Sequence, residues 1–296
     1  MDYIFKAGSC TKGELYDTII NALINAGWKN ISSNPEIDGD VMFSTGINGD
    51  KKLCFQFNYY DNVSYPMGSA SVTAYSTKTT MYQNFAIRFP GSYTPGAVGA
   101  AGTVERPKRA WKIFYPINYN AGVGLPPSAV VNYYLYVDKN KLIMATKMAD
   151  TYSTKWNLFY IGVPDTSYAI GEDSRELLYS SNSLAGLANG AWMSNYPDKA
   201  LGDVGDTYYA TNFLSIAAPR SPNLNAKYFL SDIYVKTDAY GMIAKMDGVY
   251  SLNATNIMSG DIVTVGTAQY LIFDLSLQIA GTSCGWPTYA MAIRIQ

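Results

Sequence analysis

The chain has 296 residues, with 22 basic and 23 acidic side chains, 26 tyrosines and no histidine. The lack of histidine excludes Ser-His-Asp and Cys-His catalysis, as well as His-ligated zinc or iron sites. Because the net charge is only −1, the chain offers no positive surface for nucleic acid or for an anionic membrane. We therefore expect a binding or structural protein, with no catalytic residue, no cofactor and no metal site.

Hydrophobic residues make up 48% of the chain, whereas charged residues make up only 15%. Tyrosine, serine, threonine, asparagine and glycine must then form much of the surface, and such a surface suits burial in contacts. The first residues show no secretory signal, and no apolar run reaches the length of a membrane span. Cys10, Cys54 and Cys284 lie far apart, which favours reduced, mostly buried thiols over one distant disulfide.

A helix is predicted over residues 11–26. Thr11 and Glu14 have the spacing of a capping box, in which each side chain bonds the other residue's backbone N–H. Apolar residues then recur at spacings of four and three: Leu15, Ile19, Leu23 and Ala26. Gly27 can adopt the left-handed conformation that ends a helix, and Trp28 would cover one end of its apolar face. The helix should therefore pack on a sheet.

After this helix the hydrophobic period changes to two, which is typical of strands. Short runs rich in β-branched and aromatic residues occur at 41–45, 53–60, 70–76, 111–117, 130–138, 142–149 and 157–163. The loops 46–50 and 138–141 have hairpin length, so adjacent strands should pair antiparallel. The first half of the chain is thus predicted to be a helix on a meandering sheet.

The pattern weakens over residues 164–227, where turn residues predominate and only a short helix at 174–179 is indicated. Strands resume at 227–237, 262–265, 269–277 and 289–295. We therefore predict a mainly β fold with antiparallel sheets of sandwich or meander type. Residues 1–163 and 228–296 would form one sheet system around a long irregular insertion. Irregular segments of this length inside a domain are uncommon, and they often have a function or become ordered against a partner.

A second irregular segment, residues 90–103, is rich in glycine and small residues. It lacks the Gly-Lys-Ser/Thr ending of a phosphate-binding loop, and we expect it to be a flexible arm. Arg106, Lys108 and Arg109 follow it. These three charges either pair with a neighbouring subunit or form a solvated loop face.

Asp198, Asp203 and Asp206 are candidates for carboxylate chemistry, because glycosidases use two carboxyl groups about 5–10 Å apart. Each of these residues lies in a turn-like stretch, where aspartate commonly bonds its own backbone, and this structural role is favoured. Their spacing also differs from that of an EF-hand calcium loop.

Tyrosines cluster at 59–60, 133–136 and 208–209. Neighbouring strand residues point to opposite faces, so at least one ring of each group is predicted to point away from the core. Exposed tyrosines favour protein contacts, and a sugar-stacking platform is the alternative.

Three parts of the chain carry a family resemblance. Residues 27–61 read GWKNISSNPEIDGDVMFSTGINGDKKLCFQFNYYD, and residues 133–147 read YYLYVDKNKLIMATK, with YIG at 160–162. The C-terminal part contains MDGVY at 246–250, GDIVTV at 260–265 and YLIF at 270–273. In these stretches the chain resembles a group of virion structural proteins from tailed bacteriophages, while residues 164–227 are unmatched.

The resemblance implies a β-rich subunit of the tail or baseplate and supplies no catalytic residues. The expected partners are copies of the chain and other virion proteins, and the expected location is the virion, after synthesis in the bacterial cytoplasm. Neither nucleic acid nor membrane is expected as a partner. Our candidate contacts in the two irregular segments are four residues of the types that dominate interface energetics: Tyr93, Arg109, Trp192 and Tyr196.

Two other functions stay open. A receptor- or carbohydrate-binding virion protein would keep its tyrosine-rich loops exposed and bind a host surface glycan. A glycan-degrading enzyme would instead need a cleft lined by paired carboxylates.

Overall fold

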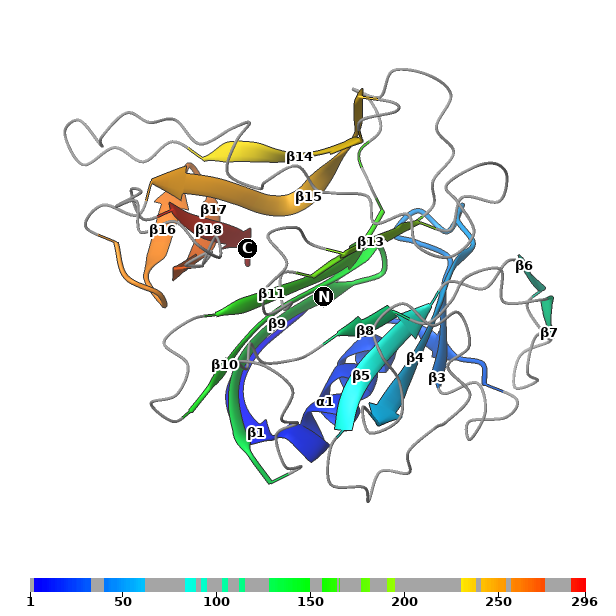
Figure 1. Ribbon diagram of the computed structural model, residues 1–296. Coiled ribbons are helices and arrows are strands. Elements are labelled where there is room, and N and C mark those ends of the chain that lie inside the picture. The colour runs from blue at the N-terminus through cyan, green and yellow to red at the C-terminus, as the bar shows by residue number, and fades with distance from the viewer. Residues whose placement is uncertain are drawn as a thin grey trace.

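A computed structural model describes residues 3–32, 40–61, 83–88, 92–94, 103–105, 112–114, 128–149, 156–163, 165, 177–181, 191–194, 230–237, 241–253, 257–274 and 289–296. Over these residues the fold is mainly β, with three antiparallel sheets, a two-stranded ribbon and one helix (Figure 1). The predicted fold class is confirmed. None of the described helical segments is able to cross a bilayer.

The central sheet has six antiparallel strands in the order β1-β9-β10-β11-β12-β13. Their bounds are Tyr3–Thr11, Val130–Asp138, Lys141–Met148, Asn157–Gly162, Leu178–Ser181 and Ala191–Ser194. The first strand pairs with β9 along its whole length, from Tyr3 opposite Asp138 to Thr11 opposite Val130. Strands β9 and β10 form the predicted hairpin.

The second sheet has the order β2-β3-β4-β5-β8. Its strands are Lys29–Asn30, Asp40–Ser44, Leu53–Asp61, Gln83–Arg88 and Lys112–Phe114. The third sheet has the order β14-β15-β18-β17-β16, with strands Ser231–Thr237, Gly241–Asn253, Tyr289–Arg294, Ala268–Asp274 and Ile262–Val265. The separate ribbon pairs β6 (Ser92–Thr94) with β7 (Thr103–Glu105).

Helix α1 (Lys12–Asn25) begins and ends as its sequence predicts. The Thr11 backbone N–H donates to Glu14 Oε2 at 2.9 Å, and the Glu14 N–H donates to Thr11 Oγ1 at 3.3 Å, which completes the capping box. Gly27 has a φ of 96°, in the left-handed region. Trp28 follows and is 2% exposed, so the chain leaves the helix directly into the core.

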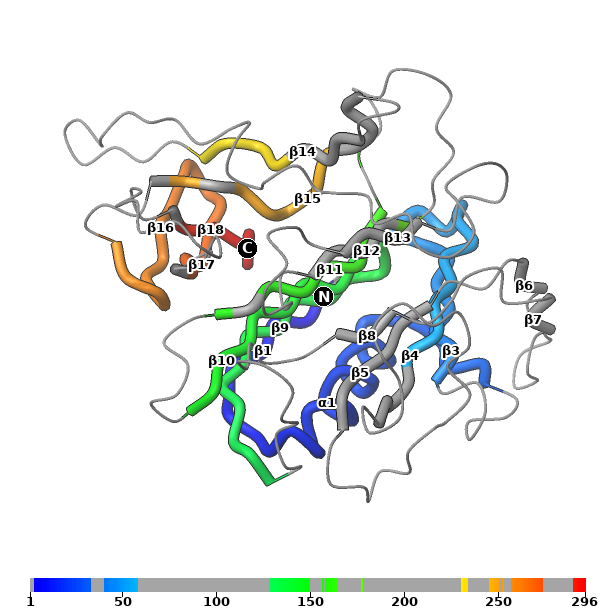
Figure 2. The backbone as a smooth tube through the Cα atoms, viewed as in Figure 1, coloured from blue at the N-terminus to red at the C-terminus, as the bar shows by residue number. Residues whose placement is uncertain are grey.

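Both faces of the central sheet are buried, because alternate residues of its strands enter different hydrophobic clusters. Leu135 and Val137 of β9 pack with α1 and the second sheet. Ile143 of β10 and Tyr160 of β11 pack instead with the third sheet. The described part therefore has three layers, with the central sheet between α1 and the second sheet on one side and the third sheet on the other (Figures 1 and 2).

Several sequence predictions need correction. The insertion 164–227 is partly regular, because β12 and β13 extend the central sheet, and Leu178–Ser181 is a strand where a short helix was expected. Part of the predicted arm 90–103 pairs in the β6–β7 ribbon. The C-terminal strands form their own sheet, packed face to face on the central one. The predicted strand 70–76 lies outside the described residues.

Gly162, the last residue of β11, gives a test of the packing between the layers. A Cβ at this position would lie 2.4 Å from the Tyr160 hydroxyl and 3.0 Å from Lys141 Cβ. Tyr160 is fully buried and has no room to move away. We expect Gly162→Ala to lower the free energy of unfolding by about 1–3 kcal/mol, measured by urea denaturation.

Gly8→Ala is the matched control for this experiment. A Cβ at Gly8 of the edge strand β1 would approach the Tyr133 hydroxyl at 3.0 Å. Tyr133 is only partly buried, so its ring can yield. An equal or larger loss of stability for Gly8→Ala would contradict the packing account of Gly162.

Candidate functional site

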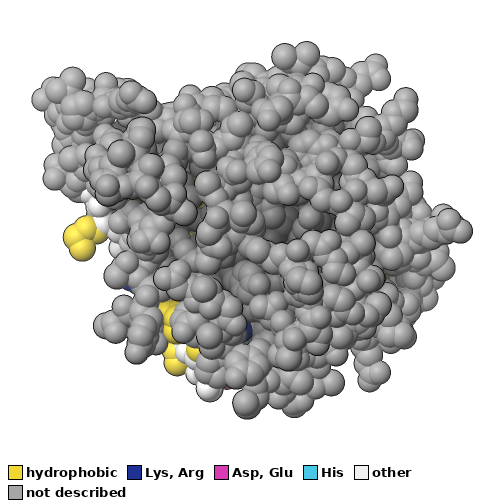
Figure 3. Space-filling view, viewed as in Figure 1, with side chains coloured by type: hydrophobic (Ala, Val, Ile, Leu, Met, Phe, Trp, Pro, Cys, Tyr) yellow, Lys and Arg dark blue, Asp and Glu magenta, His cyan; other side chains and the backbone are white. Residues whose placement is uncertain are grey.

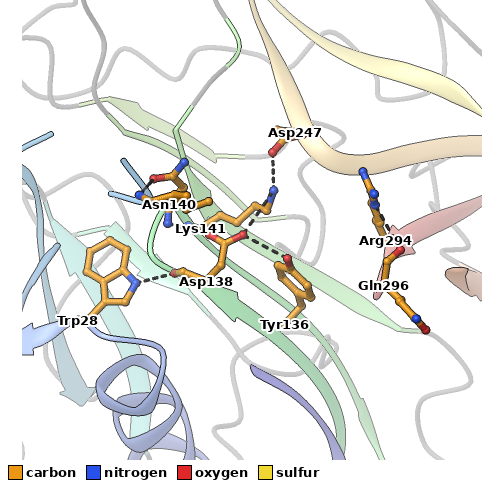
Figure 4. A network of polar contacts seen from close by, with 9 residues as sticks. Trp28, Tyr136, Asp138, Asn140, Lys141, Asp247, Arg294 and Gln296 are labelled. Atoms are coloured by element: carbon orange, nitrogen blue, oxygen red, sulfur yellow. Dashed lines mark hydrogen bonds and ion pairs between the residues drawn. The ribbon is translucent and has the colours of Figure 1, made fainter. Parts of the chain in front are cut away.

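The loop between β9 and β10 joins the three layers. The Trp28 indole N–H donates to the Asp138 carbonyl oxygen at 2.7 Å, which attaches the end of α1 to this loop (Figure 4). The Ser44 hydroxyl at the end of β3 donates to the Lys139 carbonyl oxygen at 2.6 Å, and the Ile47 N–H donates to Asn140 Oδ1 at 2.9 Å. The second sheet and the helix thus share one anchor on the central sheet.

Asp138 organises this loop through its carboxylate. Its Oδ1 accepts from the backbone N–H of Asn140 at 2.7 Å and of Lys141 at 2.9 Å, an aspartate turn that fixes the hairpin. Its Oδ2 accepts from the Tyr136 hydroxyl at 3.2 Å and lies 3.6 Å from Lys141 Nζ. Burial raises the pKa of Asp138, although Lys141 and the two N–H groups oppose this rise.

Two lysines link the central sheet to the third sheet. Lys141 Nζ also forms an ion pair with Asp247 of β15 (Figure 4). Lys245 of the same strand lies 3.2 Å from Asp165, which follows β11, and 3.7 Å from Asp232 of β14. The contacts of Lys141 with Asp247 and of Lys245 with Asp165 thus join β15 to the central sheet.

The Asp138–Lys141–Asp247 group is a structural junction. A glycosidase pair would face a cleft, with one carboxylic acid free to give its proton and one carboxylate free to attack or to activate water. Here both carboxylates contact the same ammonium group, and both oxygens of Asp138 already accept hydrogen bonds. The described residues also contain no group of three or more aspartate, glutamate or cysteine side chains arranged to hold a metal ion.

Half of the large hydrophobic residues that are exposed in the described part of the chain lie in β16 or shortly before it. They are Met258 at 74%, Ile262 at 55% and Val265 at 48%. Hydrophobic side chains of described residues also appear at two places on the face shown in Figure 3. We take the β16 hairpin as the candidate interface.

Among the described residues, strand β16 pairs only with β17 and so forms one edge of the third sheet. It reads Ile-Val-Thr-Val, all with high β propensity and without lysine or proline, the residues that commonly protect such edges. The neighbouring carboxylate of Asp261 accepts from the Met258 N–H at 2.8 Å. This carboxylate thus fixes the turn before the strand.

No protein-family model matches the chain. No curated protein is significantly similar to it either.

The structure describes two of the four predicted contact residues, and neither belongs to the β16 hairpin. Tyr93 lies in β6 of the separate ribbon, opposite Val104, and Trp192 lies in β13 at the edge of the central sheet, opposite Ser180. Arg109 and Tyr196 lie outside the described residues, as do Asp198, Asp203 and Asp206. These candidates stay predictions, and β16 is added to them.

The tyrosines of β9 pack on both faces of the central sheet. Tyr133 packs against the cluster shared with α1, while Tyr134 packs against the opposite cluster, and both residues stay partly exposed. The Tyr134 ring lies 5.1 Å from the ring of Phe273 and 5.1 Å from that of Trp156. Because apolar clusters cover both faces of this sheet, neighbouring rings of β9 contact different layers.

The sequence predicted β16 as a strand with the observed bounds, but it did not indicate that this strand is an edge. Edge position depends on the order of strands in the sheet, which the local pattern does not encode. The available signal was the run of four uncharged residues followed by a short turn at Gly266.

Proposed function

We propose that this chain is a structural subunit of a phage particle, located in the tail or baseplate, that acts through contacts between subunits. Its partners would be further copies of itself and other virion proteins, and its role would be geometric and not catalytic. The observation that carries the proposal is the open, uncharged edge of β16 with its exposed apolar side chains. An exposed edge of this kind invites another chain to pair with it.

Two further properties support an assembly role. Charged residues are few and nearly balanced, so the surface has little electrostatic repulsion to keep copies apart. The buried layers, with a core on each face of the central sheet, provide a rigid body from which an edge can be presented. The resemblance to phage virion proteins gives the assembly its proposed location.

The test of this function is the mass of the purified protein in solution. Light scattering would be recorded over a range of protein concentrations, alone and after mixing with tail proteins of the same phage. We expect a discrete oligomer or a stoichiometric complex with a tail component. A monomer under all these conditions would contradict the assembly role and direct attention to glycan binding and hydrolysis assays.

A further inference from the structure

The hydrogen-bond pattern of the third sheet determines which groups of β16 face outward. Gln269 of β17 lies opposite Thr264, but its backbone groups bond the chain after β18, on the side of β17 away from β16. Its N–H donates to the Gln296 carbonyl oxygen at 3.1 Å, and its carbonyl oxygen accepts from the Ile295 N–H at 2.9 Å. Since opposite residues of an antiparallel pair bond alternately, the backbone N–H and C=O of Thr264 point to the open edge.

The same alternation places Ile262 in the outward set. One residue earlier, the Asp261 carbonyl oxygen accepts from the Ile272 N–H of β17 at 2.9 Å, so Asp261 bonds inward. Ile262 therefore presents its N–H and C=O to the open edge, as Thr264 does, while Val263 between them bonds to β17. The edge thus offers two donors and two acceptors, arranged symmetrically about Val263.

We propose that β16 pairs antiparallel with β16 of a second copy of this chain, on a two-fold axis that passes through Val263. Ile262 of each copy would exchange two backbone hydrogen bonds with Thr264 of the other, which gives four bonds in all. The third sheet would then continue across both copies. This inference rests on the proposed assembly function and names the contact through which two copies meet.

Three observations favour a second copy as the occupant. The outward groups are self-complementary, as an isologous contact requires. In this register Asp261, the nearest charge, lies opposite Val265 of the second copy, so the two carboxylates do not face each other. The edge has no charge that would attract a charged partner, and the exposed Ile262 would gain cover from the added strand.

A strand of four residues buries little area compared with the ~1,000 Å² or more of a stable interface. The contact is therefore expected to be weak between free copies and to become effective when other contacts hold copies close together. A covalent trap is the suitable test for such a contact, because it accumulates a transient pair.

The test is oxidation of Val263→Cys. In the proposed pairing Val263 lies opposite Val263 of the second copy, in a non-hydrogen-bonded position. The Cα atoms of such a pair are about 4.5 Å apart, which is within the range that a disulfide spans. We expect this variant to form a disulfide-linked dimer under mild oxidation, at least tenfold faster than Val265→Cys on the same strand or Thr267→Cys in the turn. The unmodified protein, with its own cysteines, is oxidised in parallel.

A second substitution tests the hydrogen bonds. Thr264→Pro removes the N–H that points outward and leaves the bonds to β17 in place, a position that an edge strand tolerates. Added to Val263→Cys, it should abolish the rapid cross-linking, while circular dichroism shows that the fold is retained. Equal cross-linking of the three cysteine variants, or none in Val263→Cys, would overturn the proposed pairing.

These outcomes separate the inference from the function on which it rests. If light scattering shows an oligomer or a tail complex while Val263→Cys does not cross-link, the pairing fails and the assembly role stands. If Val263→Cys cross-links selectively but no tail component is bound, the pairing stands and the proposed location fails.

Discussion

Replacing Trp28 by alanine is expected to lower the free energy of unfolding by about 3–5 kcal/mol. The indole is 2% exposed, its ring lies 5.3 Å from that of Phe55 in β4, and its N–H donates to the Asp138 carbonyl. The substitution therefore removes packing between the helix and the second sheet, and it also removes the bond to the β9–β10 loop. Urea unfolding followed by circular dichroism would measure the loss.

Trp28→Phe separates these two contributions. It keeps an aromatic ring in the core but leaves the buried Asp138 carbonyl without the indole donor, which should cost about 1–3 kcal/mol. Trp156→Phe is the control, because Trp156 is only partly buried between Tyr134 and Phe273. If Trp28→Phe were as stable as the unmodified protein, the bond to the loop would contribute nothing.

Lys12→Met is expected to stabilise the protein at pH 7, by about 1–3 kcal/mol. Lys12 is the first residue of α1 and only 2% exposed, and burial lowers its pKa from 10.5 to about 8. A positive charge at the N-terminus of a helix is also unfavourable. Methionine keeps most of the apolar length of the side chain and avoids the cost of burying an ammonium group.

The gain should depend on pH in a defined direction. Between pH 8 and 10.5 the unfolded chain binds a proton at Lys12 that the folded protein has released, so the contribution of Lys12 to the free energy of unfolding rises with pH. The advantage of Lys12→Met is therefore full below pH 8 and shrinks toward pH 10. Burial raises the pKa of Cys10 to about 11, which lowers stability above pH 9 in both proteins and cancels in the comparison.

Denaturant unfolding at pH 7, 8, 9 and 10 measures this effect. Lys52→Met is the matched control, because Lys52 is exposed before β4. Its effect should stay within about 0.5 kcal/mol at every pH. A Lys12→Met variant that is less stable than the parent at pH 7 would show that the ammonium group is net stabilising.

The parts of the fold that were predictable are those fixed by neighbouring residues. The capping box at Thr11, the left-handed Gly27 and the β9–β10 loop all depend on residues close in sequence, and each is observed.

The parts that were not predictable depend on distant residues. Strand β1 was missed because it is stabilised by pairing with β9, more than a hundred residues later. Strand β15 was missed because Asp247-Gly248 reads as a turn, whereas Gly248 has a φ of 83° inside a strand whose pairing with β14 is irregular. The candidate edge and the packing of Tyr133 and Tyr134 on opposite faces likewise follow from sheet order and layering.

The pairing of β1 with β9 also sets an order of events during synthesis. Strand β1 leaves the ribosome well before its partner, which begins only at Val130, so β1 cannot pair until β9 has been made. Helix α1 depends only on residues close in sequence and can form before then. We therefore expect α1 to form before β1, the strand that directly precedes it, is paired.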